Sequence, residues 1–164
     1  MRQYGSRLIG SGSAVPSTLL TNADLEQMVE TSNDWIEQRT GIRERHVCVP
    51  EKGEGTLSLA TEALEKALDD ANLKGSDLDL VLVSTVTGEM VCPSTACRVA
   101  ANVGAVPAGA FDIGAACPGF VYAMSVADSL IRTGRYARSG APAPCPQDAT
   151  ERGLLAPVAP LSPD

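Results

Sequence analysis

The residues around Cys117 have the types and spacing of a nucleophile at the start of a helix. Cys117 follows a short apolar run that ends in small residues, and Pro118 and Gly119 come directly after it. The free amide groups and the positive dipole end of a helix favour an anion, so this position suits a nucleophilic thiolate. A small buried cysteine that packs like an alanine is the other interpretation, and the local sequence does not decide between them.

A second candidate site lies where Trp35, the only tryptophan, precedes Arg39 by four residues. Residues at this spacing face the same way on a helix, so the indole and the guanidinium could clamp a purine nucleotide. The residues alone favour the alternative, a capped short helix with Trp35 in the core and Arg39 paired with a carboxylate. His46, the only histidine, lies in a charged segment with nothing to direct it toward Cys117, and we expect it at the surface.

Composition excludes several classes of function. The 164 residues are 44% apolar and only 4% aromatic, which predicts one domain with an aliphatic core. A net charge of −7 argues against nucleic acid as a partner. The five cysteines include no Cys-x-x-Cys pair, so neither a disulfide framework nor a metal site is expected. No apolar stretch suits a membrane span or a signal peptide, which predicts a cytoplasmic protein.

The hydrophobic pattern predicts strands that alternate with helices, an α/β arrangement with a parallel sheet. The expected strands are 7–13, 80–86 and 110–113, and the expected helices are one that begins after 21, then 56–71, 94–103 and 118–133. The run at 80–86 is apolar without alternation, as in a strand buried on both faces. The Gly10-Ser11-Gly12-Ser13 segment lacks the lysine of a phosphate-binding loop and predicts close backbone packing instead. From 137 to 164, six prolines and no periodicity predict a disordered tail.

Six segments together resemble the β-ketoacyl-acyl carrier protein synthase III family of thiolase-like condensing enzymes, over roughly residues 5 to 136. They are IGSG at 9–12, TNADL at 21–25, TSNDW at 31–35, RTGIRERH at 39–46, PSTAC at 93–97 and FDIGAAC at 111–117. The resemblance implies the N-terminal half of a thiolase-like αβαβα fold. Residues 1–136 would form this incomplete half-domain, and 137–164 would be a proline- and alanine-rich tail outside the family.

The resemblance also implies an acyltransferase of fatty acid biosynthesis that condenses an acyl-CoA primer with malonyl-acyl carrier protein. Cys117 would carry the acyl group as a thioester. Thr31, Trp35 and Arg39 would bind coenzyme A. This differs from the local interpretation above, in which Trp35 lies in the core and Arg39 pairs with a carboxylate. Cys92 would line the acyl pocket of the partner in a homodimer, and its small size predicts tolerance of larger primers. No metal or organic cofactor is implied.

In this family a histidine and an asparagine from the second half of the fold promote decarboxylation of the malonyl group. Neither is present in a matching context, so we expect that this truncated chain does not complete the condensation. Two alternatives remain. One is a starter-unit synthase or acyltransferase of polyketide biosynthesis, and the other is a noncatalytic fragment that binds coenzyme A or a thioester.

Overall fold

The computed structural model of the chain describes residues 6–143 and 158–160. Within this part, a body is built on a mixed five-stranded sheet. Its strands follow one another across the sheet in the order β1 (Ser6–Leu8), β7 (Val158–Pro160), β6 (Ser139–Gly140), β4 (Leu80–Ser84) and β5 (Gly109–Ile113). β4 runs parallel to β5 and β6, but β7 runs antiparallel to β1 and β6. The expectation of a wholly parallel sheet is therefore corrected.

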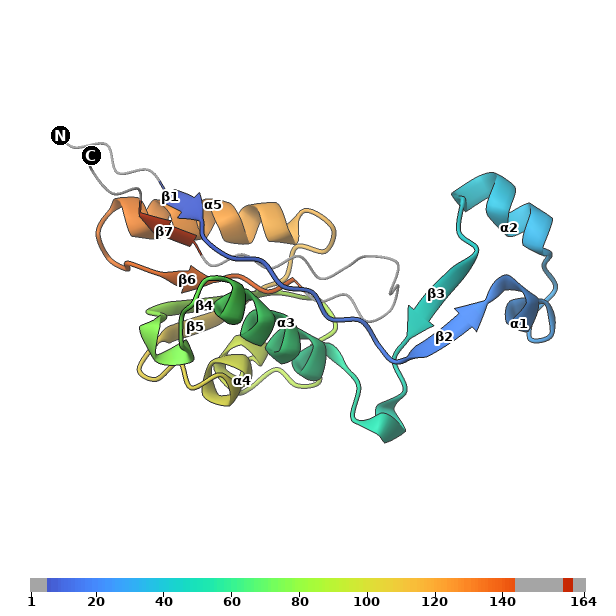
Figure 1. Cartoon of the computed structure of the whole chain (residues 1–164), viewed down its shortest axis with the longest axis horizontal. Coiled ribbons are helices and arrows are strands. Elements are labelled where there is room, and N and C mark those ends of the chain that lie inside the picture. The colour runs from blue at the N-terminus through green and yellow to red at the C-terminus, as the bar shows by residue number, and fades with distance from the viewer. Residues whose placement is uncertain (1–5, 144–157, 161–164) are drawn as a thin grey trace.

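Helices cover both faces of the sheet (Figure 1). α5 (Gly119–Arg132) lies on one face, and α3 (Thr56–Asp70) and α4 (Thr95–Asn102) lie on the other. All five residues of β4 are buried. Val81 and Val83 pack with α3 and α4, whereas Leu80 and Leu82 pack with α5. Alternate side chains of a strand point to opposite faces, so this strand needs apolar residues at every position, as its sequence predicts.

The glycine-rich segment after β1 runs closely along α3. A Cβ atom on Gly10 would lie 2.4 Å from the Ala67 carbonyl oxygen, and one on Gly12 would lie 2.3 Å from that of Ala63. Only glycine allows such an approach of two backbones. The interpretation of this segment as a packing element is confirmed.

An arm projects from the body (Figure 1). It consists of the antiparallel pair β2 (Thr18–Thr21) and β3 (Glu44–Val47), with α1 (Asn22–Glu26) and α2 (Asn33–Thr40) at its far end. A capping box between Thr21 and Asp24 begins α1, so the helix starts after residue 21, as the sequence predicts. Short 3₁₀ turns lie at Pro50–Lys52 and Gly75–Asp77. The pairing of β2 with β3 was not predicted, because the two strands are short and far apart in the chain.

Residues 137–143 are folded into the body, which corrects the expected disorder for this part of the tail. Ser139–Gly140 pairs with β4, and Ala141 and Pro142 are fully buried. The Asp79 carboxylate accepts hydrogen bonds from the amides of Ala137 and Arg138, at 2.9 and 3.1 Å. A two-residue strand of small residues has no hydrophobic period, so the sequence pattern could not reveal it. The same prediction for 144–157 and 161–164 falls outside the described residues.

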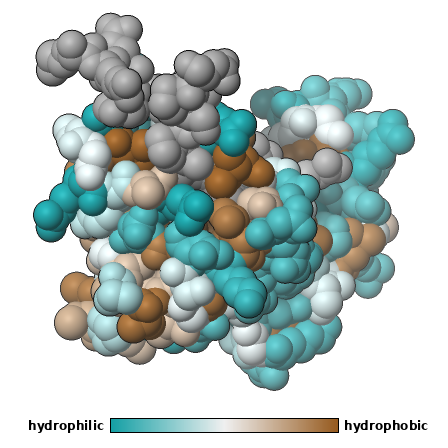
Figure 2. Space-filling model, turned by 60° about the vertical axis from the view of Figure 1, so that its left-hand side comes forward, coloured by the Kyte–Doolittle hydropathy of each residue, from teal (hydrophilic) through white to brown (hydrophobic). Residues whose placement is uncertain are grey.

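Apolar side chains also remain on the surface of the body, where brown areas interrupt the teal in Figure 2. The large side chains that are exposed include Phe111 on β5 and Val121 and Tyr122 in the first turn of α5. Scattered exposed apolar residues are ordinary, but these flank the connection that carries Cys117. In the part of the chain that the structure describes, no helix is long and apolar enough to cross a membrane.

Candidate active site

Cys117 lies on the connection between β5 and α5, where the parallel strands β4 and β5 reach their carboxyl ends. This edge is where open α/β sheets bind their ligands. The thiol is exposed to solvent. Its exposure contradicts the interpretation of Cys117 as a packed, buried residue and leaves the sulfur accessible to a substrate.

A tight turn holds Cys117 at the start of α5. Ala116, directly before it, has a φ of 49°, a left-handed conformation that costs a non-glycine residue energy. The carbonyl of Ala116 accepts a hydrogen bond from the amide of Gly119, at 2.9 Å, which closes the turn. Pro118 occupies the N-cap and Gly119 the first helical position, one residue later than the sequence predicts.

Close packing of Gly119 against β4 fixes the position of this turn. A Cβ atom on Gly119 would lie only 1.9 Å from Ser84 Oγ. Because Gly119 lacks that atom, α5 can begin directly against the strand, and Cys117 stands above the contact. The local structure therefore presents the sulfur at a defined point.

The backbone near Cys117 can stabilise an anion. Among the described residues, the amide of Cys117 donates no hydrogen bond. α5 begins two residues later, so its positive dipole end is directed at the same place. A free amide at a helix start is the arrangement that binds the oxyanion of a tetrahedral intermediate.

The second candidate site is at the tip of the arm, on α2. Ser32 caps this helix by accepting a hydrogen bond from the Trp35 amide, and Gly41 ends it with a φ of 71°. The Arg39 guanidinium carbon lies over the Trp35 ring, 4.8 Å from its centroid. Trp35 is 54% exposed, so its predicted place in the core is wrong. Arg39 forms no ion pair with the described residues, which contradicts the other half of that interpretation.

A cavity of about 340 Å³ adjoins the Trp35 ring and is lined by Glu30, Thr31, Ser32 and Trp35. The structure thus brings Thr31 and Trp35 together, as the resemblance implies, with the Arg39 guanidinium stacked on the ring. An exposed aromatic ring with a cation over one face can hold a planar heterocycle against its other face, and the cation can pair with an attached phosphate.

His46 belongs to the arm and not to the surroundings of Cys117. It lies on β3, and its Nδ1 is 2.8 Å from the carbonyl oxygen of Pro16, to which it donates a hydrogen bond. In Figure 1, β3 is well separated from the connection between β5 and α5. The structure therefore assigns His46 to the packing of the arm, where it is half-buried.

A single carboxylate fastens the root of the arm. Glu54 accepts hydrogen bonds from the amides of Ser17, at 2.8 Å, and Val49, at 2.9 Å, so it joins the chain before β2 to the chain after β3. The pKa of Glu54 is lowered to about 2. The hydrogen bonds from Ser17 contribute most, followed by the hydrogen bond from Val49 and the nearby positive charge of Lys52. Burial, followed by the charge of Glu54, raises the pKa of the Cys48 thiol.

Cys92 lies in the loop that joins β4 to α4 and is exposed.

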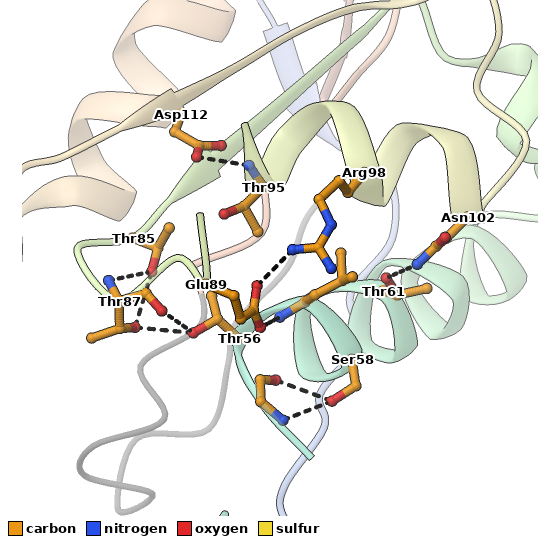
Figure 3. A network of polar contacts seen from close by, with 12 residues as sticks. Thr56, Ser58, Thr61, Thr85, Thr87, Glu89, Thr95, Arg98, Asn102 and Asp112 are labelled. Carbon is orange, nitrogen blue, oxygen red and sulfur yellow. Dashed lines mark hydrogen bonds and ion pairs between the residues drawn. The ribbon is translucent and has the colours of Figure 1, made fainter. Parts of the chain in front are cut away.

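A network of polar side chains near this loop was not predicted from the sequence (Figure 3). Its members come from α3, α4, β5 and the loop itself, and they include Thr56, Thr87, Glu89, Arg98 and Asp112. Their partners lie far apart in the chain, so no local sequence signal could have revealed the network.

No cluster of three or more His, Cys, Asp or Glu side chains that could hold a metal ion occurs within residues 6–143 and 158–160.

Known proteins share both the sequence and the fold. Residues 111–139, from β5 through α5 to β6, match the family model of 3-oxoacyl-[acyl-carrier-protein (ACP)] synthase III. Over 129 residues the chain is 52% identical to the β-ketoacyl-[acyl-carrier-protein] synthase III of Caldanaerobacter subterraneus and 50% identical to that of Xylella fastidiosa. Over these 129 residues the chain matches the β-ketoacyl-acyl carrier protein synthase III family. The match to the family model extends to residue 139, beyond the predicted end of the resemblance at residue 136.

The alignments cover 79% of this chain but only 38% and 39% of these two synthases, so the chain spans less than half of their length. Among solved structures, the synthase III of Aquifex aeolicus has a TM-score of 0.88 and 38% identity, over 98% of this chain and 55% of that chain. The priming β-ketosynthase of the R1128 polyketide pathway has the same TM-score and 29% identity, over 98% of this chain and 51% of that chain. The predicted α/β fold of the thiolase-like synthases is confirmed for about half of their structure.

Proposed function

We propose that Cys117 takes an acyl group from an acyl-CoA thioester, as the first half of a β-ketoacyl-acyl carrier protein synthase III reaction. The observation that carries the proposal is the exposed thiol on a tight turn at the start of α5, with an amide that has no partner among the described residues. The likeness to synthases of this name supports it.

The groups of this site can carry out the acylation step. The Cys117 thiol gives its proton to water, and the resulting thiolate attacks the thioester carbonyl. The negative charge moves to the carbonyl oxygen, where the Cys117 amide and the α5 dipole stabilise it. Collapse of the intermediate breaks the bond to the sulfur of coenzyme A, which leaves as a thiolate and takes a proton from water. The product is an acyl thioester on Cys117.

Coenzyme A would be held at the tip of the arm. The adenine would stack on the Trp35 ring, the Arg39 guanidinium would pair with a phosphate, and Thr31 would line the same cavity. Binding far from the reacting carbonyl restricts the thioester and lowers the entropic cost of attack.

In the second half of the reaction, the acyl group would pass from Cys117 to the carbanion that forms when malonyl-acyl carrier protein loses carbon dioxide. The product would be a β-ketoacyl carrier protein of fatty acid biosynthesis. His46, the only histidine, lies on β3 in the arm, so we assign to the residues of this chain the acylation step alone. A homodimer would place Cys92 at the acyl pocket of the partner.

Labelling with radioactive acetyl-CoA tests the proposal. We expect the parent chain to retain one acetyl group per chain after denaturation, and Cys117→Ser to retain none. Cys97→Ser is the matched control, because it removes another exposed thiol and should leave the labelling unchanged. Equal labelling of the parent and Cys117→Ser, or an unlabelled parent, would show the proposal to be wrong.

A second candidate is the priming step of polyketide biosynthesis, favoured by the TM-score of 0.88 to the R1128 priming synthase. The same acyl-enzyme would form, but from a larger primer. Cys92, a small side chain at the predicted acyl pocket, is compatible with such primers. Faster labelling by hexanoyl-CoA than by acetyl-CoA would favour this candidate.

A further inference from the structure

We propose that Glu54 is a positioning residue for the acylation of Cys117. It fixes the arm on the body, so that coenzyme A bound on the arm presents its thioester at the thiol. The inference rests on the proposed function. It adds a residue that touches neither the reacting atoms nor coenzyme A.

The two candidate sites lie on different units of the molecule. The coenzyme A clamp, Trp35 and Arg39 on α2, is at the far end of the arm, whereas Cys117 lies on the body (Figure 1). Within the described residues, no helix or strand of the arm packs extensively on one of the body. The root of the arm, residues 14–18 and 47–55, therefore sets where the clamp stands relative to the thiol.

Glu54 fastens both chains of the root to the body. Oε1 accepts a hydrogen bond from the Ser17 amide, at 2.8 Å, and Oε2 accepts one from the Val49 amide, at 2.9 Å. α3 begins two residues after Glu54, and its start is tied by the Gly55 amide, which donates to Ser58 Oγ at 2.9 Å. A carboxylate held at both oxygens cannot turn without breaking a contact, so the root is fixed to the start of α3.

Two further side chains hold the chain before β2. Lys52 Nζ donates to the hydroxyls of Ser17 and Thr18, at 3.2 and 2.8 Å, and His46 Nδ1 donates to the Pro16 carbonyl at 2.8 Å. Lys52 and His46 thus join the two chains of the root to each other. Glu54 joins them to the start of a body helix, so it is the contact that decides the direction of the arm.

Apolar packing holds only part of the root. Ala14 is buried in the core beside α3. Farther along the root lies a cavity of about 600 Å³, lined from the root by Cys48 and Glu54 and from the body by Leu57 and Arg98. Because open space adjoins the root here, close packing cannot fix its direction, and the hydrogen bonds of Glu54 have to do so.

The span between the clamp and the thiol should control the rate of acylation. A group tethered at a distant binding site reacts at an effective concentration that the span sets. A misplacement of about 1 Å can cost up to about a hundredfold in rate. A loosened root would lower the effective concentration of the thioester without changing the thiol. The effect of Glu54 should therefore appear only with a thioester that carries the nucleotide.

The test compares two thioesters on the full chain, Glu54→Ala, Glu54→Gln and the control Glu51→Gln. Glu51 is an exposed carboxylate in the 3₁₀ turn of the same root. Acetyl-CoA carries the nucleotide, whereas the acetyl thioester of N-acetylcysteamine has the same reacting group without it. Mass spectrometry gives the second-order rate constants for acylation of Cys117 by each, and for its alkylation by iodoacetamide. Hydrogen exchange of peptides that cover the root reports on its mobility.

We expect Glu54→Ala to lower the rate with acetyl-CoA by about tenfold. The rate with the N-acetylcysteamine thioester and the rate of alkylation should stay within about twofold of the parent. Exchange in the root should become faster. Loss of a negative charge would by itself favour the anionic coenzyme A, so charge cannot cause the expected loss. Glu54→Gln keeps one acceptor oxygen and should fall between the parent and Glu54→Ala, which preserves the test if Glu54→Ala fails to fold.

The double variant of Trp35→Ala and Glu54→Ala tests whether Glu54 acts through the clamp. Once Trp35 is removed, the nucleotide is poorly held and the direction of the arm matters less. Glu54→Ala should then cost less than about threefold with acetyl-CoA. Losses that multiply in full would overturn the inference, because Glu54 would act independently of the clamp.

Three other results also overturn it and leave the proposed function standing. They are an unchanged rate with acetyl-CoA in Glu54→Ala, an equal loss with both thioesters, and an equal loss in Glu51→Gln. A parent chain that both thioesters acylate equally fast overturns the coenzyme A clamp, and the inference with it. A parent chain that is alkylated but acylated by neither thioester overturns the proposed function itself.

Discussion

Gly119 packs so closely against Ser84 that a Cβ atom added to the glycine would lie 1.9 Å from the serine Oγ. This contact sets the height of the first turn of α5 above β4, and thereby the place of Cys117 two residues before. The reactivity of the thiol should therefore depend on a residue that never touches the substrate.

Gly119→Ala should destabilise the chain by about 1–3 kcal/mol, because the added methyl group overpacks a buried contact. Urea unfolding measures the loss. Gly114→Ala is the matched control in the same connection, since its new Cβ would meet its nearest neighbour, the Thr85 carbonyl oxygen, at 3.9 Å. Addition of Ser84→Ala should recover part of the loss. Equal losses in the two glycine variants would contradict the assigned contact.

Trp35→Ala should raise the acyl-CoA concentration that gives half the maximal rate of Cys117 acylation, and should leave alkylation of Cys117 by iodoacetamide unchanged, because the clamp lies on the arm. Stacking of a base on an aromatic ring contributes about 1–3 kcal/mol, so we expect an increase of roughly 5- to 150-fold. Trp35→Phe keeps an aromatic face and should lose less. A lowered maximal acylation rate at an unchanged half-saturating concentration would place Trp35 in the chemical step instead.

Glu54 should stabilise the arm in a pH-dependent manner. Its pKa is lowered in the folded chain from 4.5 to about 2, so its contribution is fully present above 4.5 and is lost as the pH falls toward 2. Thermal unfolding of the parent and Glu54→Gln should differ near neutral pH and converge in acid. Glu62→Gln serves as the control for loss of a surface carboxylate. A difference that stays constant down to acid pH would argue against the two amide hydrogen bonds as its source.

Thr95→Val should leave the chain as stable as the parent or raise its stability by about 1 kcal/mol. Among the described residues, Thr95 Oγ1 is buried without a hydrogen-bond partner, and valine removes that unpaired hydroxyl at nearly the same volume. Thr56→Val makes the same chemical change where the hydroxyl bonds to Thr87, and it should cost about 1–3 kcal/mol. Chemical denaturation of the two variants checks the contrast, and a loss in Thr95→Val equal to that in Thr56→Val would refute it.

Local signals predicted much of the body correctly. The stripe of apolar residues at 56–71 became α3, and Ser94 caps α4 by accepting from the Cys97 amide. The apolar run at 80–86 became the buried strand β4, shortened at its carboxyl end. These elements depend on residues within a few positions of one another, so their patterns can be read directly.

Predictions failed where a residue's surroundings come from distant parts of the chain. Met28 and Val29 have helical spacing, yet α1 ends at Glu26 and both side chains are exposed, because no other described segment covers that side of the arm. Ser139 and Gly140 carry no strand signal, but β4 offers them a partner. The ion pair between Glu89 and Arg98 also requires two elements whose distance only the folded sheet sets.

The sequence by itself determined that Cys117 lies between a strand and a helix, because periodicity and helix termini are local properties of the chain. It also determined that Trp35 and Arg39 share a helix face, since four residues make about one turn. Only the tertiary structure decided that Cys117 is exposed at the edge shared with the loop of Cys92, and that Trp35 faces a cavity and not the core. Exposure and proximity depend on which surfaces the folded body covers, and that follows from the packing of segments far apart in the chain.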